Sequence, residues 1–281
     1  MAHVTSHGTA RPPAARVVAG AGSRLLALGF AAALLAAVGS APAAAQACTA
    51  PADLVKLQAP LPRLTAAVRN NEKIRIVALG SSSTWGAGAS SRDRAYPARL
   101  ENELRMAWPK GDVRVVNAGV NGELARHMLA RISQQVTPQN PQLVIWQTGV
   151  NDAIRGVPLE TFKQQVRTGI EALRATGADV LLIDQQYYPG FKSVKDGPLY
   201  LAALRDTAAQ YNVPVVQRFR IMEHLIASAQ FTTATLLSPD QFHLNDRSYD
   251  CLGHLLAQSL RSAAAPPLPS EMAVSKGQAR M

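Results

Sequence analysis

The chain contains 281 residues, and its 29 lysines and arginines against 19 aspartates and glutamates favour anionic surroundings such as cell-envelope polymers or lipid headgroups. The basic residues are scattered, with no lysine/arginine block and no interleaved aromatic residues, so we expect no nucleic-acid partner. No H-E-x-x-H motif and no cysteine cluster occur, so we expect no metal and no other cofactor.

Residues 1–47 have the organisation of a secretory signal peptide. Basic residues precede an alanine- and leucine-rich stretch that runs to Val38, and small residues then lead to Ala45-Gln46-Ala47. The apolar stretch is short for a membrane span, although an uncleaved anchor is the alternative. We expect an exported protein, periplasmic or secreted, with no stable membrane insertion after cleavage. Without the three arginines of this segment, 26 basic residues remain against 19 acidic ones, a formal net charge of +7.

The chain has two cysteines, Cys48 and Cys251. Cleavage after Ala47 leaves Cys48 at the new N-terminus, where a lipid-modified cysteine is one alternative. The A-Q-A sequence before it lacks the bulky aliphatic residue expected for that modification. An oxidising compartment allows one pairing, and a Cys48–Cys251 disulfide would contribute roughly 2–4 kcal/mol of stability. Two free thiols remain equally open.

Residues 48–262 have the pattern of one α/β domain, because short aliphatic runs alternate with segments of helical periodicity. A helix is expected over residues 52–70, ahead of the first strand. Strands are predicted at Ile74–Leu79, Val113–Asn117, Leu143–Trp146, Val180–Ile183 and Val213–Val216. Apolar residues recur at helical spacing over 124–136, 159–173 and 249–260. This alternation predicts a three-layer α/β/α sandwich with a mostly parallel five-stranded sheet.

The last residues, 263–281, contain three prolines and almost no apolar periodicity. We expect them to form a disordered tail.

Small and polar residues follow the first three predicted strands. The first strand runs into Gly80-Ser81-Ser82-Ser83-Thr84, the second into Asn117–Gly122 and the third into Gln147–Asp152. In open α/β sheets, ligands bind at the carboxyl ends of the strands, so these segments are expected at one edge. Each alone is more typical of an ordinary turn. A phosphate loop is not indicated, since neither G-K-[ST] nor G-x-G-x-x-G is present here.

A carboxylate and an imidazole lie three residues apart in Asp240-Gln241-Phe242-His243. On a helical turn this spacing puts both side chains on one face. The carboxylate can then hold Nδ1–H and leave Nε2 free to take a proton. Together with a serine and backbone or amide donors, this pair supplies the parts that acyl transfer needs.

These four segments together resemble the SGNH hydrolases, the lipase and esterase superfamily also known by its G-D-S-L motif. The resemblance runs from about Ile74 to Leu244 and implies an SGNH, flavodoxin-like fold. It implies that Ser82 is the nucleophile and that Asp240 and His243 are the acid and the base. The implied oxyanion donors are the backbone N–H groups of Ser82 and Gly119 and the side chain of Asn151.

The first segment departs from the superfamily pattern, because Ser81 replaces the aspartate and Ser83 the leucine. The aspartate is not the catalytic acid in the resembled mechanism, so the departure does not exclude activity. It leaves open how the turn is braced, and whether Ser81 or Ser83 attacks instead of Ser82.

The resemblance implies an exported serine esterase that hydrolyses short-chain acyl or O-acetyl esters on carbohydrate or lipid, or thioesters. Its partner is then a small-molecule or polysaccharide ester. The aromatic residues near the strand ends either line the substrate pocket or pack as ordinary loop residues; they are Trp85, Tyr187, Tyr188 and Phe242. Two other functions stay open. One is an O-acyltransferase that uses the same residues, and the other is a non-catalytic cell-envelope-binding module.

Overall fold

A computed structural model describes residues 48–265, which contain a five-stranded sheet with the strand order β2-β1-β3-β4-β5. Every neighbouring pair is parallel, so the sheet is parallel throughout. The strands are β1 (Ile74–Gly80), β2 (Val113–Gly119), β3 (Leu143–Gln147), β4 (Asp179–Ile183) and β5 (Val215–Val216). The predicted signal peptide, residues 1–47, lies outside the described residues.

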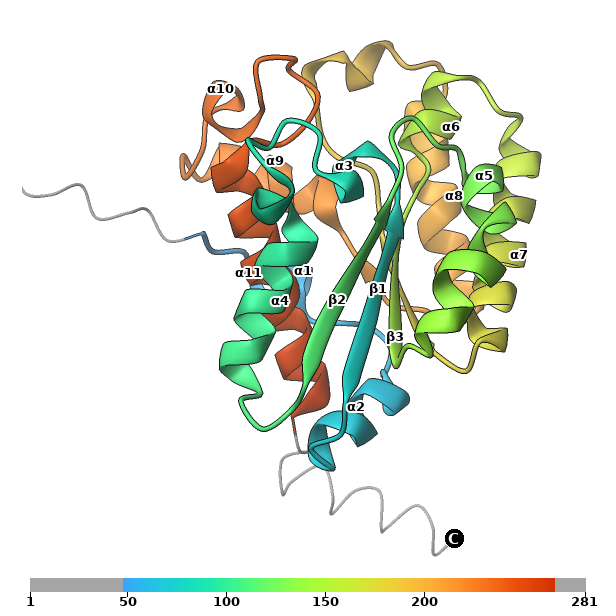
Figure 1. Ribbon diagram of the computed structural model, residues 1–281. Coiled ribbons are helices and arrows are strands. Elements are labelled where there is room, and N and C mark those ends of the chain that lie inside the picture. Colours follow the sequence, from blue (N-terminus) through green and yellow to red (C-terminus); the bar gives the residue numbers. More distant parts are fainter. Residues whose placement is uncertain (1–47, 266–281) are drawn as a thin grey trace, which may run out of the picture. The chain divides into compact units, whose positions relative to one another are not determined.

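Helices cover both faces of the sheet, which confirms the predicted three-layer α/β/α architecture (Figure 1). On one side lie α1 (Ala52–Val55), α4 (Tyr96–Ala107), α9 (Arg218–Ala227), α10 (Thr233–Leu236) and α11 (Asp246–Ala264). On the other lie α5 (Ala125–Ala130), α6 (Val150–Ile154), α7 (Leu159–Ala175) and α8 (Gly197–Gln210). The remaining helices are α2 (Pro62–Arg69), α3 (Ser82–Trp85), the π-helix η2 (Ile132–Val136) and the 3₁₀-helices η1 (Arg92–Arg94), η3 (Thr137–Gln139) and η4 (Pro189–Ser193).

Successive residues of the central strands enter two different cores. In β1, Ile76 and Ala78 pack with α4 and α11, whereas Val77 and Leu79 pack with α5 and α7. All four are fully buried. A strand that is covered on both faces needs apolar residues at consecutive positions, which is why these strands show no polar alternation.

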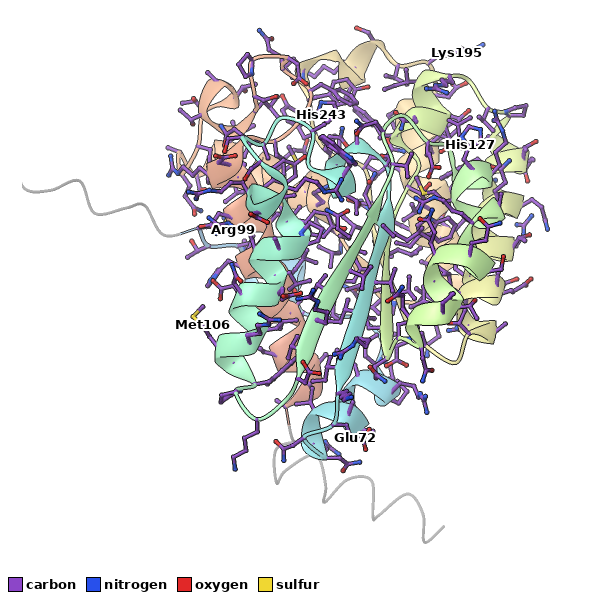
Figure 2. The ribbon with its side chains drawn as sticks, viewed as in Figure 1. Glu72, Arg99, Met106, His127, Lys195 and His243 are labelled. Atoms are coloured by element: carbon purple, nitrogen blue, oxygen red, sulfur yellow. A yellow bond between two sulfur atoms is a disulfide. The ribbon has the colours of Figure 1, made fainter. Side chains whose placement is uncertain are left out.

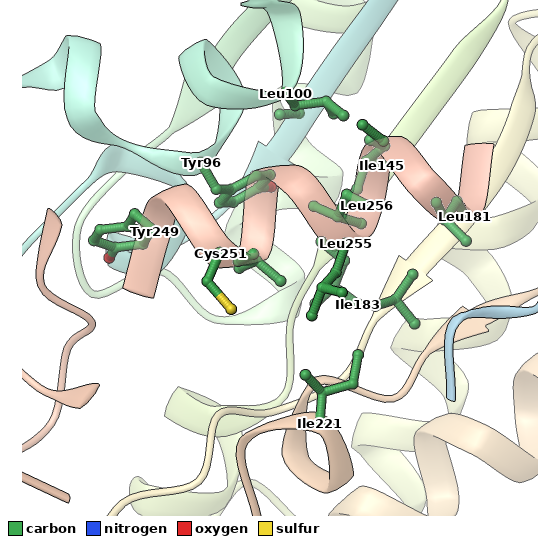
Figure 3. Close-up of a cluster of buried hydrophobic side chains, with 14 of the residues drawn as sticks. Tyr96, Leu100, Ile145, Leu181, Ile183, Ile221, Tyr249, Cys251, Leu255 and Leu256 are labelled. Carbon is green, nitrogen blue, oxygen red and sulfur yellow. The ribbon is translucent and has the colours of Figure 1, made fainter. Parts of the chain in front are cut away.

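The last helix, α11, is buried along much of its length against the sheet and α4. Figure 3 shows Leu255 and Leu256 of this helix beside Ile145 and Ile183 of the central strands. Cys251 of the same helix forms a disulfide with Cys48, with 5.5 Å between the two Cα atoms. Of the two states that the sequence left open, the structure has the disulfide, which joins the segment before α1 to α11.

Several predicted segments differ from the structure. Residues 52–70 form two helices, because Pro60 and Pro62 interrupt the helical hydrogen bonding between α1 and α2. The segment 124–136 forms α5 and then the π-helix η2. The fifth strand is limited to Val215–Val216.

At the C-terminal end, α11 continues to Ala264, so residues 263 and 264 are helical rather than part of the predicted tail. Ala264 is buried, and its packing extends the helix. Residues 266–281 lie outside the described residues. In the part of the chain that the structure describes, no helix has both the length and the apolar character of a membrane span.

Candidate active site

The serine turn lies at the carboxyl end of β1. The strand ends at Gly80, Ser81 precedes the helix, and Ser82 begins the short helix α3. A side chain at position 80 would place Cβ 2.1 Å from Thr84 Oγ1, so the tight turn requires glycine there. Ser82 stands at the first helical position, where the backbone N–H has no intrahelical partner. Within residues 48–265 this N–H has no other hydrogen-bond acceptor either.

The structure brings Ser82, His243 and Asp240 into one hydrogen-bonded line. His243 Nε2 lies 2.8 Å from Ser82 Oγ, and His243 Nδ1 lies 2.6 Å from Asp240 Oδ2. The carboxylate accepts the Nδ1–H, which leaves Nε2 to accept the serine proton. Figure 2 shows His243 at the end of the sheet toward which the strands point.

The Asp240–His243 segment is a loop, and the expected helical turn is wrong. Gln241 has a φ of 54°, in the left-handed region. Asp240 Oδ1 accepts hydrogen bonds from the backbone N–H groups of Phe242 and His243, both at 2.9 Å. The carboxylate therefore shapes its own loop while its second oxygen holds the imidazole.

The ionised form of Asp240 is stabilised by its surroundings. Burial acts to raise the pKa of this carboxyl, but hydrogen bonds from the His243 ring, the Ser238 hydroxyl and two backbone N–H groups outweigh burial. They hold the pKa of Asp240 well below its ordinary value. The orienting group thus stays charged over the neutral range.

Neither of the neighbouring serines, Ser81 and Ser83, forms a hydrogen bond with the His243 ring among the described residues. Ser81 is buried, and both its backbone N–H and its hydroxyl donate to Gln147 Oε1, at 3.0 and 3.1 Å. Thr84 Oγ1 donates to the same oxygen at 3.2 Å. Among the described residues, the side-chain bonds of the His243 ring go to Asp240 and Ser82, and none goes to Ser83. Gln147 is thus the brace of the serine turn, a role that sequence reasoning missed.

Asn151 lies on α6, directly after the end of β3. Its Nδ2 donates to the Glu123 carbonyl at 2.8 Å, which fixes the orientation of the amide. One N–H of the same NH₂ group remains available for a further acceptor. Glu123 was not among the predicted site residues.

Gly119 occupies a different environment from the one that its predicted role implies. Its N–H donates to Asn117 Oδ1 at 3.0 Å. A Cβ at this position would lie 2.1 Å from Trp85 N, so glycine is needed for the close approach of β2 to α3.

Within residues 48–265, Gly122 offers a backbone N–H without a partner near Asn151, and this glycine was not singled out from the sequence. It has a φ of 72°, is half-buried, and its N–H finds no acceptor within the described part of the chain. It precedes Glu123, whose carbonyl accepts the Asn151 amide, so its N–H lies on the loop that meets Asn151. The sequence feature that could have identified it is its place as the second glycine of the Asn117–Gly122 segment.

An open cavity of about 670 Å³ adjoins the site. Phe242 lies 4.8 Å from the His243 ring and 4.6 Å from Tyr188, measured between ring centroids, so an aromatic wall leads from the imidazole into the cavity. Its apolar lining is completed by residues of α6, the loop after α6, the start of α7, the residue after η4, and α8: Ile154, Pro158, Leu159, Val194 and Tyr200.

Only two of the four predicted pocket residues line this cavity, Tyr188 and Phe242. Tyr187 packs against Phe219, with 5.7 Å between ring centroids. Trp85 follows Ser82 on α3, is 37% exposed and lies under the Arg92 guanidinium. The side chains of residues 48–265 form no cluster of three or more histidines, cysteines, aspartates or glutamates suited to a metal ion.

Residues 47–266 match the model of the non-GDSL lipase-like family. The chain is 34% identical to the esterase TesA of Pseudomonas aeruginosa over 128 residues, which cover 46% of this chain and 60% of that protein. It is 24% identical to an arylesterase of Vibrio mimicus, over 70% of this chain and 92% of the relative. Among solved structures, a two-domain esterase active on acetylated mannans superposes with a TM-score of 0.64 at 20% identity, covering 76% of this chain and 56% of that one.

Proposed function

Since the chain belongs to the non-GDSL lipase-like family, we propose that it is a serine esterase in which Ser82 attacks a carboxylic ester. The observation that carries this proposal is the hydrogen-bonded line from Asp240 through His243 to Ser82. A binding module needs no base beside a serine hydroxyl, so this geometry favours catalysis over binding alone. The SGNH resemblance agrees with the family match, and the name non-GDSL fits the serines at positions 81 and 83.

The reaction proceeds in two halves. His243 Nε2 takes the Ser82 proton while Oγ bonds to the ester carbonyl carbon, and the carbonyl oxygen becomes an oxyanion. The C–O bond to the alcohol then breaks, and His243 gives the proton to the departing oxygen. In the second half, water loses its proton to His243 and attacks the acyl-serine, and the Ser82 oxygen leaves with that proton.

Three donors meet the oxyanion in this proposal. They are the Ser82 N–H, the free hydrogen of the Asn151 amide, and a backbone N–H of the segment after β2. We assign that third donor to Gly122 rather than Gly119, because the Gly119 N–H already donates to Asn117. Donors placed where negative charge develops are the largest single source of rate in such sites.

The expected substrates are short-chain acyl or O-acetyl esters on carbohydrate or lipid. The apolar, aromatic wall of the cavity beside His243 supports an acyl group or another apolar part of the substrate at that place. We also propose that the protein is exported. The Cys48–Cys251 disulfide supports this, because such bonds persist in oxidising compartments.

The test is hydrolysis of nitrophenyl esters of increasing acyl length by the parent, by Ser82→Ala and by Ser83→Ala. We expect the Ser82 variant to lose essentially all turnover, and the Ser83 variant to keep it. Equal activity in parent and Ser82→Ala would reject the assigned nucleophile. Product analysis with an added alcohol acceptor separates hydrolysis from acyl transfer.

A further inference from the structure

The segment 120–124, which we call the oxyanion loop, joins β2 to α5 and carries Gly122. Hydrogen bonds join this loop to the end of β1 and to Asn151 on α6. The Val120 N–H donates to the Gly80 carbonyl at 3.0 Å, next to the serine turn. The Glu123 carbonyl accepts from Asn151 Nδ2 at 2.8 Å, next to the other oxyanion donor.

One guanidinium connects these two attachments. Arg131 Nε donates to Glu123 Oε2 at 2.8 Å, and an Nη2 hydrogen of the same group donates to the Gly80 carbonyl at 3.1 Å. Nη1 donates to Gln135 Oε1 at 2.6 Å. The planar group thus uses donors in three directions, which only arginine offers from a fixed fork.

The Arg131–Glu123 ion pair is shielded from solvent. The exposed fractions of the two side chains are 9% and 15%, and Arg131 Nη2 lies 2.7 Å from Glu123 Oε2. Solvent ions screen such a pair much less than they screen a surface pair. Its geometry is therefore set by the protein and is retained at ordinary ionic strength.

We propose that Arg131, acting through Glu123, is a positioning residue that sets the distance between the serine turn and the oxyanion loop. Gly80 stands two residues before Ser82, and Glu123 directly follows Gly122 and orients Asn151. The nucleophile and its proposed oxyanion donors therefore share one rigid link. This inference rests on the proposed ester hydrolysis.

The role differs from that of a general structural ion pair. A misplaced oxyanion loop leaves the substrate bound but no longer supports the charge that develops at the carbonyl oxygen. The loss then appears in kcat rather than in KM. A displacement of about 1 Å at such a site costs on the order of 100-fold in rate.

Lysine is the informative replacement. Arg131→Lys keeps the positive charge beside Glu123, but its single nitrogen cannot reproduce the planar fork toward Gly80, Glu123 and Gln135. Glu123→Gln keeps the side-chain shape and removes the charge. A control pair of the same residue types, with a more exposed arginine, lies at the amino end of β2, the end away from the serine turn. There, Arg105 Nε donates to the Val113 carbonyl at 3.0 Å and Nη2 pairs with Glu101 at 2.9 Å.

The experiment uses the full chain with its disulfide formed, nitrophenyl acetate as substrate, and phenylboronic acid as inhibitor. A boronic acid forms a tetrahedral adduct with the nucleophilic serine and so reports on the oxyanion donors. We expect Arg131→Lys to lower kcat about 100-fold with KM nearly unchanged, and to lower the affinity for the boronic acid by a similar factor. Glu123→Gln should lose kcat in the same way, and the double variant should lose less than the product of the two single losses.

The outcomes separate this inference from the proposed function. If the parent neither hydrolyses the ester nor binds the boronic acid, the proposed function fails and this inference with it. If the parent is active and Arg131→Lys keeps its kcat, or loses only KM, the positioning role alone is overturned. It is overturned equally if Arg105→Lys shows the same kcat loss, because a general effect of breaking such a bridge then explains both. A variant that does not fold is replaced by Glu123→Gln, whose unchanged kcat overturns the inference too.

Discussion

At the scale of single residues, two amide side chains do much of the organising at the site. Gln147 Oε1 accepts from three donors of the serine turn, which uses this acceptor fully and explains how the turn is held without the superfamily's aspartate. Asn151 gives one hydrogen to Glu123 and keeps the other free. One amide thus braces the turn that carries the proposed nucleophile, and the other keeps a hydrogen free for the proposed oxyanion.

Replacing Asn151 by alanine removes one of the proposed oxyanion donors. We expect kcat to fall by about 10²–10³, because a lost donor of this kind costs roughly 3–4 kcal/mol of transition-state stabilisation. The measurement is steady-state hydrolysis of a nitrophenyl ester beside a thermal unfolding curve. The control is Asn102→Ala, at an exposed position on α4. Full turnover in a folded Asn151 variant would remove this residue from the proposed mechanism.

At the scale of elements, α5 and α6 are linked through a buried carboxylate. Both carboxylate oxygens of Asp152, on α6, lie 3.2 Å from the Ala125 N–H at the start of α5. Burial raises the pKa of Asp152 to about 6, and the backbone hydrogen bonds only partly oppose it. Ionisation of Asp152 therefore lowers the free energy of unfolding.

The pH dependence of stability follows from this shift. The folded-state pKa lies above the ordinary value of 3.8, so Asp152 stabilises the fold below that value, and the contribution disappears as pH rises toward about 6. The full difference amounts to about 3 kcal/mol. We expect Asp152→Asn to abolish this part of the pH dependence when urea unfolding is followed between these pH values.

Asp240 has the opposite effect on the pH dependence of stability. The pKa of Asp240 is lowered, so its contribution is present above the ordinary value and is lost as pH falls below it. Parallel stability curves of parent and Asp152→Asn across the window would contradict the assignment to Asp152.

At the scale of the whole described domain, the strand order decides where the site forms. In the order β2-β1-β3-β4-β5, the chain passes from β1 to β2 on one side of β1 and then returns to β3 on the other side. Because the strand order reverses between β1 and β3, the carboxyl ends of these two strands border a crevice. Ser82 follows β1 and Asn151 follows β3, which places the proposed nucleophile and the proposed amide donor at that crevice. The loop after α10 then brings His243 from far along the chain.

The disulfide acts on the same scale. It joins Cys48 to Cys251 across a sequence separation of 203 residues, and neither cysteine belongs to the proposed triad. We expect the double variant Cys48→Ser/Cys251→Ser to lose roughly 2–4 kcal/mol of unfolding free energy while kcat stays near that of the parent. Guanidinium unfolding with and without reductant measures this, and an unchanged midpoint would show that the bond adds no stability.

The amino-acid sequence alone determined the layers, the parallel sheet and the segments that carry the proposed triad, whereas the choice between a Cys48–Cys251 disulfide and two free thiols came from the structure. It did so because aliphatic runs, glycine turns and the Asp240–His243 spacing are local signals. Only the tertiary structure decided that Ser82 rather than Ser81 meets His243, that Gln147 braces the turn, and that the Gly119 N–H is already engaged. Those outcomes depend on which side chain reaches which acceptor across long stretches of chain, and local periodicity carries no record of such contacts.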